Sequence, residues 1–212
     1  MIKAVIFDLD GTLIDTNDLI IDTFYHVINE LLGRSPTIEE LNHVYGRTLD
    51  EQMRFFSEER SQELVDAYKS YYRAHMDKRT HLFEGVKDLL VKLTEMGIKI
   101  ATVTNKGSRG VRHAFDKFDI GDYFDATISA DDVSNGKPDP EGIFAVLDKL
   151  GIEAYEALFV GDSLNDIAAA KKAGVLSVLV GWTLFHEEHY SEFGADFIID
   201  KPMDLIKLLK KQ

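Results

Sequence analysis

The sequence predicts an α/β protein, with a doubly wound parallel sheet that carries an inserted, all-helical domain. Short apolar runs rich in β-branched residues recur along the chain, and from residue 84 onward they alternate with helical patterns. Such alternation is typical of parallel strands that helices cover on both faces. Between about residues 15 and 82 only helical patterns remain. We therefore expect a core domain of residues 1–15 and 83–212 and a helical domain of residues 16–82.

Six apolar runs are the expected strands of the core. They lie at residues 4–7, 98–103, 126–129, 157–160, 175–180 and 197–199. Ahead of the second run, apolar side chains recur at Val86, Leu89, Leu90 and Leu93, and the pattern stops at Gly97. This spacing predicts a helix with one apolar face and a glycine after its last turn.

The inserted segment has helix signals of its own. Residues 19–32 and 61–75 repeat apolar side chains at helical spacing, and capping-box patterns begin at Thr37 and Thr48. Sequential strands usually lie beside one another. An insertion of this size between the first and second strands therefore indicates a lid that covers a binding site. Extra helices packed on the sheet are the alternative.

The composition excludes several classes of protein. The 24 Lys and Arg against 37 Asp and Glu give a net charge of -13, which disfavours nucleic acid and anionic membranes as partners. Cysteine is absent, so disulfides and thiolate chemistry are excluded and any metal ligands are oxygen or imidazole. The sequence contains no signal-peptide pattern and no run of about 18 apolar residues, and we expect a cytoplasmic protein. The oligomeric state is left open.

Polar residues follow four of the predicted strands, at the point where each strand ends. In strand order they are Asp8 and Asp10, then Thr104, Asn105 and Lys106, then Lys137, then Asp162 and Asp166. In open α/β sheets, ligands bind in the crevice outside the carboxyl ends of the strands. Each residue alone is ordinary in a turn or helix cap, but carboxylates, a hydroxyl and a lysine at one sheet edge predict a ligand site.

Other motifs are excluded or weak. An EF-hand calcium loop starting at Asp8 would need glycine where Leu13 stands and glutamate where Leu19 stands. The glycine-rich patterns of P-loops and dinucleotide-binding folds do not occur. The run from His186 to His189 matches neither common zinc-hydrolase pattern, and we expect a solvated face there.

Together these residues resemble the motifs of the haloacid dehalogenase superfamily. Residues 7–12 (FDLDGT) resemble its first motif, residues 103–105 (VTN) its second, Lys137 in GKPDP its third, and residues 161–163 (GDS) with Asp166 its fourth. Their order, spacing and strand context agree over the whole chain. An insert between the first and second motifs is similar to the helical-cap subclass, which implies a mobile lid.

The resemblance implies a phosphatase that forms an aspartyl-phosphate. Asp8 would attack phosphorus, and Asp10 would protonate the leaving oxygen and then deprotonate water. Dehalogenase members lack the second carboxylate, so Asp10 favours phosphate chemistry. Two adjacent carboxylates repel each other unless a cation or a proton intervenes, and their separate roles account for the pair.

A dianionic substrate beside Asp8 requires a compensating cation, and a set of oxygen ligands suits Mg2+. The expected ligands are Asp8, the backbone carbonyl of Asp10 and Asp162, with Asp166 as a ligand or as a residue that positions one. The expected contacts to the phosphoryl oxygens are Thr104, Asn105 and Lys137.

The substrate contact is expected in the insert. Arg47 lies between two predicted helices, where similar proteins place a specificity loop; the alternative is a surface arginine before a helix cap. The stretches TNDLI and GRTLDEQM resemble the phosphoglycolate phosphatase group and its pyrophosphatase relatives. We expect a small phosphorylated metabolite, with phosphoglycolate first and pyrophosphate or a sugar phosphomutase reaction as alternatives. A receiver-type phospho-acceptor domain is the non-enzymatic alternative.

Overall fold

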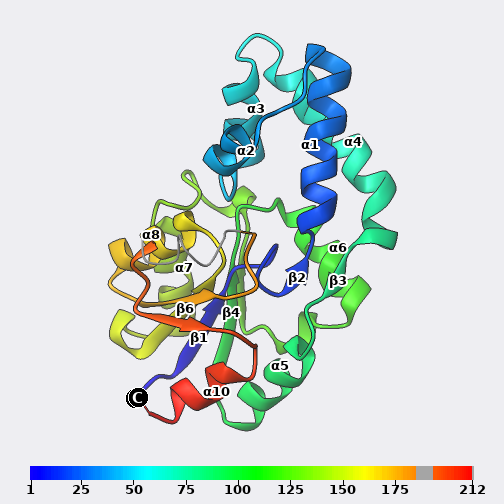
Figure 1. The fold of residues 1–212 in the computed structure, drawn as a ribbon. Helices are drawn as coiled ribbons and strands as arrows, with labels where there is room; N and C mark the ends of the chain where they lie inside the picture. Colours follow the sequence, from blue (N-terminus) through cyan, green and yellow to red (C-terminus); the bar gives the residue numbers. More distant parts are fainter. Residues whose placement is uncertain (185–192, 212) are drawn as a thin grey trace.

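A six-stranded parallel sheet forms the centre of the computed structural model, which describes residues 1–184 and 193–211 (Figure 1). In order across the sheet, the strands are β5 (Ala126–Ile128), β4 (Lys99–Val103), β1 (Ala4–Phe7), β6 (Ala157–Gly161), β7 (Leu176–Val180) and β8 (Phe197–Ile199). The register places Phe7 beside Thr102 of β4 and Val160 of β6. The chain therefore leaves β1 between the ends of β4 and β6.

Helices cover both faces of the sheet, because successive side chains of a strand point to opposite sides. Val5 and Phe7 belong to one apolar cluster, and Ala4 and Ile6 belong to another. The first cluster includes side chains of α5 (Val86–Glu95), α6 (Ser108–Phe118) and α10 (Asp204–Leu209). The second includes side chains of α7 (Glu141–Leu150) and α8 (Leu164–Ala173). Burial on both faces explains why every residue of β1 is apolar.

Four helices form a separate layer, here called the cap, beyond the sheet (Figure 1). They are α1 (Asn17–Leu32), α2 (Ile38–Val44), α3 (Leu49–Phe56) and α4 (Ser61–Arg79). Their apolar faces meet in a cluster of their own. In it the ring of Phe24 lies 5.8 Å from that of Phe56 and 5.3 Å from that of Tyr68, measured between centroids. The cap thus has a hydrophobic core distinct from those of the sheet.

The two predicted capping boxes are confirmed. Thr37 begins α2, and its hydroxyl accepts a hydrogen bond from the N–H of Glu40, whose carboxylate accepts one from the N–H of Thr37. Thr48 and Glu51 repeat this arrangement at the start of α3. Each box satisfies backbone donors that the first turn of a helix leaves open.

A short antiparallel pair, for which the sequence shows no strand signal, lies where the chain enters and leaves the cap. β2 (Ile14–Asp15) pairs with β3 (His81–Leu82), with Ile14 opposite Leu82. Two residues are too few to reveal an alternation of polar and apolar side chains. The pair holds the two connections to the cap side by side.

The predicted fold class is confirmed, and all six predicted strands are present close to their expected bounds. The run from His186 to His189 lies outside the described residues. Among the helices within those residues, none combines the length and the apolarity that crossing a membrane requires.

Phe24→Ala tests the separate core of the cap. Phe24 is almost fully buried, so we expect the substitution to lower the free energy of unfolding by about 3–5 kcal/mol. Chemical denaturation measures this, with Phe144→Ala as the control, because Phe144 is half exposed on α7. The control should change stability by only about 0.5 kcal/mol, and equal effects of the two substitutions would contradict a packed cap core.

Candidate active site

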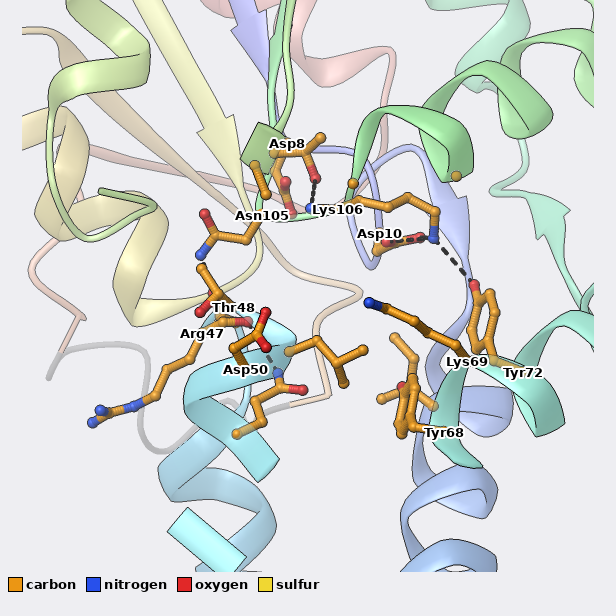
Figure 2. A pocket seen from close by; sticks show the side chains of 18 of the residues that line it. Asp8, Asp10, Arg47, Thr48, Asp50, Tyr68, Lys69, Tyr72, Asn105 and Lys106 are labelled. Atoms are coloured by element: carbon orange, nitrogen blue, oxygen red, sulfur yellow. Dashed lines mark hydrogen bonds and ion pairs between the residues drawn. The ribbon is translucent and has the colours of Figure 1, made fainter. Parts of the chain in front are cut away.

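A cavity of about 580 Å³ lies between the cap and the carboxyl ends of the strands. Its lining comes from both layers: Asp8, Asp10 and Lys137 belong to the core, and Tyr68 and Lys69 belong to α4 of the cap. Figure 2 shows the side chains of Asp8 and Asp10 on one side of this space and those of Tyr68 and Lys69 on the other. The predicted edge of the sheet therefore borders a cavity that the cap and the core share.

Lys137 joins two carboxylates from distant parts of the chain. Its Nζ donates to Asp8 Oδ1 and to Asp166 Oδ1, each at 2.6 Å. All three side chains are buried. Burial lowers the pKa of Lys137, but the charges of Asp166 and Asp8 outweigh burial and raise the pKa above its usual range. Lys137 is therefore a fixed positive charge at the floor of the cavity.

The start of α8 fixes the side chain of Asp166. Its Oδ2 accepts hydrogen bonds from the N–H groups of Asp162 and Ser163 and from the Ser163 hydroxyl, at 3.2, 2.9 and 2.7 Å. The Ser163 hydroxyl accepts in turn from the N–H of Asp166, which completes a capping box. One oxygen of Asp166 is committed to this box and the other to Lys137. This geometry favours a positioning role for Asp166 over direct metal binding.

Asp162, at the end of β6, is held by residues from three other segments. Thr12 Oγ donates to its Oδ1 at 3.3 Å, and the Tyr45 hydroxyl donates to its Oδ2 at 3.2 Å. The Thr183 hydroxyl donates to its backbone carbonyl at 2.7 Å. The carboxylate of Asp162 thus has a defined orientation beside Asp8.

Asp8, Asp162 and Asp166 form a buried acidic cluster, in which one carboxylate oxygen of each lies within 4.8 Å of the others. Burial raises the pKa of Asp8 to about 6 despite Lys137, and burial with the neighbouring carboxylates raises the pKa of Asp162 well above its usual range. Three carboxylates around one ammonium leave an excess of negative charge that a divalent cation would balance. These oxygen donors fit the predicted Mg2+.

Asp10 lies outside this cluster and pairs with Lys106, which the sequence placed at the end of the second predicted strand without giving it a role. Its two carboxylate oxygens accept hydrogen bonds from Lys106 Nζ at 3.0 and 2.8 Å (Figure 2). The same Nζ donates to the Tyr72 hydroxyl of α4 at 3.2 Å. Burial lowers the pKa of Lys106, but Asp10 outweighs this effect and raises it above the usual range. Lys106 directly follows Asn105, so its place after a strand was a usable signal.

The side chain of Asn105 braces the site. Its Nδ2 donates to the carbonyl groups of Gly46 and Lys137 at 2.8 and 2.9 Å, and its Oδ1 accepts from the N–H of Lys137 at 2.9 Å. Both amide hydrogens are therefore used, which leaves none for the predicted phosphoryl contact in this arrangement. Thr104 is buried and lines the cavity, and its hydroxyl oxygen accepts from the N–H of Lys106 at 3.2 Å.

Arg47 lines the cavity but does not approach Asp8 or Asp10. Its Nε donates to the His43 carbonyl within the cap at 3.0 Å, and its guanidinium group points away from Asp10 in Figure 2. The amino group of Lys69, in contrast, points from α4 towards Asp10 (Figure 2). Lys69 is thus a cavity residue that the sequence reasoning missed, because helical spacing alone does not show which charged residues face the core.

The motifs and geometry agree with one family. Residues 5–180 match the family model described as haloacid dehalogenase-like hydrolase. The chain belongs to this family. Pyrophosphatase PpaX of Anoxybacillus flavithermus is 36% identical, over 98% of this chain and 97% of the relative, and that of Halalkalibacterium halodurans is 34% identical over the same shares.

A solved structure supports the fold. The crystal structure described as a predicted phosphoglycolate phosphatase from Haemophilus somnus has a TM-score of 0.87 at 24% identity, over 98% of each chain. The predicted family and the predicted enzyme class, a phosphatase of this family, are confirmed. The family assignment excludes the receiver-type alternative.

Lys137→Met tests the charge balance of the acidic cluster. The substitution keeps most of the length of the side chain but leaves buried carboxylates without their ammonium partner. We expect the free energy of unfolding, measured without divalent cations, to fall by about 3–5 kcal/mol. Lys210→Met, at an exposed position, is the control and should change stability by about 0.5 kcal/mol at most. Wild-type stability of Lys137→Met would show that Lys137 does not hold the cluster together.

Proposed function

We propose that this protein is a Mg2+-dependent phosphatase that acts through Asp8 on a small phosphorylated metabolite with a second anionic group. The observation that carries the proposal is the placement of Asp8. It lies at the floor of the cavity, bound to Lys137 and beside Asp162 and Asp166. Inorganic pyrophosphate is the first candidate substrate, and phosphoglycolate is the second.

The residues divide the chemistry between them. One oxygen of Asp8 binds Lys137, and the other would attack phosphorus. The bond from phosphorus to the leaving oxygen breaks, and that oxygen takes a proton from Asp10. Water then attacks the phosphorus of the aspartyl-phosphate and gives its proton to Asp10, and the bond between Asp8 and phosphorus breaks. Lys137 stabilises the negative charge that the phosphoryl oxygens carry throughout.

Bound Mg2+ would add charge stabilisation at the phosphoryl group. Asp8, Asp162 and the backbone carbonyl of Asp10 would hold it, with Asp166 positioning the loop that carries Asp162. The buried excess of negative charge in the acidic cluster supports this assignment.

The contact between Lys106 and Asp10 favours a substrate with a second anion. Lys106 donates hydrogen bonds to both oxygens of Asp10. It has to release Asp10 before this carboxyl group can donate a proton to the leaving oxygen. A second anionic group on the substrate offers Lys106 another partner. Pyrophosphate and phosphoglycolate both carry such a group.

Further cations line the same cavity. Lys69 and Arg73 come from α4 and Arg109 from α6. A chain with a net charge of -13 repels anions at long range, so local cations are needed to capture one. The names of the PpaX relatives support pyrophosphate as the first candidate here, whereas the sequence put phosphoglycolate first.

Asp8→Asn tests the nucleophile. The amide has nearly the same shape but cannot form the aspartyl-phosphate, so we expect kcat to fall by about 10^3-fold or more, while circular dichroism shows an intact fold. Asp148→Asn, at an exposed position of α7, should retain normal turnover. Near-normal turnover by Asp8→Asn would rule out covalent catalysis by this residue.

Lys69→Met tests the second-anion subsite. We expect kcat/KM for pyrophosphate to fall by about tenfold or more, because a charge-assisted contact is lost. For p-nitrophenyl phosphate, which has no second anion, the change should stay within about twofold. Lys78→Met, at an exposed position of the same helix, controls for the loss of charge. Equal losses with both substrates would mean that Lys69 does not select for a second anion.

A further inference from the structure

One turn of the cap is fastened directly onto the acidic cluster. This cap turn, Tyr45 and Gly46, lies between α2 and α3 and makes three hydrogen bonds to described residues of the core. The Tyr45 hydroxyl donates to Asp162 Oδ2 at 3.2 Å, and Asn165 Nδ2 donates to the Tyr45 carbonyl at 3.3 Å. Asn105 Nδ2 donates to the Gly46 carbonyl at 2.8 Å. The contacts therefore reach the loops after β4 and β6, which also border the cavity.

The cap turn can approach the core this closely because a glycine lies on each side of the contact, Gly46 in the cap and Gly11 in the core. A Cβ on Gly11 would lie 2.3 Å from Asp162 Oδ2 and 3.0 Å from the Tyr45 hydroxyl oxygen. A Cβ on Gly46 would lie 2.8 Å from Ser163 Oγ. Both glycines also have positive φ, +81° and +78°, which other residues rarely adopt. The backbone of the cap and that of the core are thus both shaped for this contact.

The Tyr45 hydroxyl completes the orientation of Asp162. Thr12 holds Oδ1 from the core, and Tyr45 holds Oδ2 from the cap. The hydroxyl oxygen also lies 2.9 Å from Asn17 Oδ1, at the start of α1. The phenol has one hydrogen for these two acceptors, and the ionised carboxylate of Asp162 is the stronger one. Each carboxylate oxygen that accepts such a bond keeps a second lone pair for a cation. Tyr45 can therefore orient Asp162 without occupying its whole capacity to bind metal.

We propose that Tyr45 is a positioning residue that links closure of the cap to assembly of the divalent-cation site. The hydrogen bond from Tyr45 to Asp162 exists only while the cap turn contacts the core. Tyr45 therefore orients Asp162 only when the cap is closed. A cation that binds the oriented carboxylate then favours closure, and closure strengthens cation binding by the same factor. This inference rests on the metal site of the proposed function, but it does not depend on the identity of the substrate.

Tyr45→Phe tests the link, because it removes only the hydroxyl group. We expect the dissociation constant of Mn2+, measured without substrate from the electron paramagnetic resonance of free Mn2+, to rise by about tenfold. Tyr155→Phe makes the same change at a 71% exposed position of the core and should leave the constant unchanged. Gly46→Ala lifts the cap turn while keeping the hydroxyl, so it should weaken Mn2+ binding in the same direction.

Hydrogen exchange provides a second readout. In the wild-type protein, Mn2+ should slow exchange of the backbone amides of residues 45–48, and this protection should be lost in Tyr45→Phe. Unchanged or tighter Mn2+ binding by Tyr45→Phe would overturn the link. Failure of the wild-type protein to bind Mn2+ would overturn both the link and the proposed metal dependence, whereas failure of turnover alone would concern only the proposed reaction.

Discussion

The site depends on the two ion pairs that Lys137 forms with Asp8 and Asp166. They join the end of β1, the loop before α7 and the first turn of α8 within a buried space. Buried charges are costly to desolvate, and the loss of one partner leaves the others uncompensated. The fold keeps these charges paired because separate contacts hold each partner in place. β1 lies beside β6, a capping box holds Asp166, and Asn105 holds the backbone of Lys137.

The same charge distribution accounts for the cations that the cap contributes to the cavity. The acidic cluster repels an anionic substrate, and so does the chain as a whole, so catalysis requires positive charge gathered locally. Lys137 and a divalent cation would provide it at the reacting phosphoryl group. Lys69, Arg73 and Lys106 line the cavity and would provide it towards the cap. The cap would therefore supply part of the charge that binds the substrate, and through Tyr45 it makes a hydrogen bond to the acidic cluster.

Much of this architecture was predictable from the sequence, because its signals are local. Buried parallel strands read as apolar runs, and a capping box requires only two residues three positions apart. The candidate residues were predictable as a group, because the carboxyl ends of parallel strands meet at one edge. The chemistry expected of Asp8 and Asp10 rested on the resemblance to a family.

The remaining features depend on contacts between distant segments. Tyr45 reaches Asp162 across 117 positions and Lys106 reaches Asp10 across 96, and no local pattern encodes either pairing. Arg47 was predicted from its loop position alone, and its guanidinium group points elsewhere because the His43 carbonyl accepts from its Nε. The pair of β2 and β3 is too short to show a strand pattern.

The central claim is that the acidic cluster supports transfer of a phosphoryl group to Asp8. Borohydride reduces an acyl phosphate to an alcohol, so trapping during turnover of pyrophosphate with Mg2+ should convert Asp8 to homoserine, as peptide mass spectrometry would show. The conversion should require both substrate and Mg2+. Steady turnover with no homoserine at position 8, or with the modification at another carboxylate, would contradict the account.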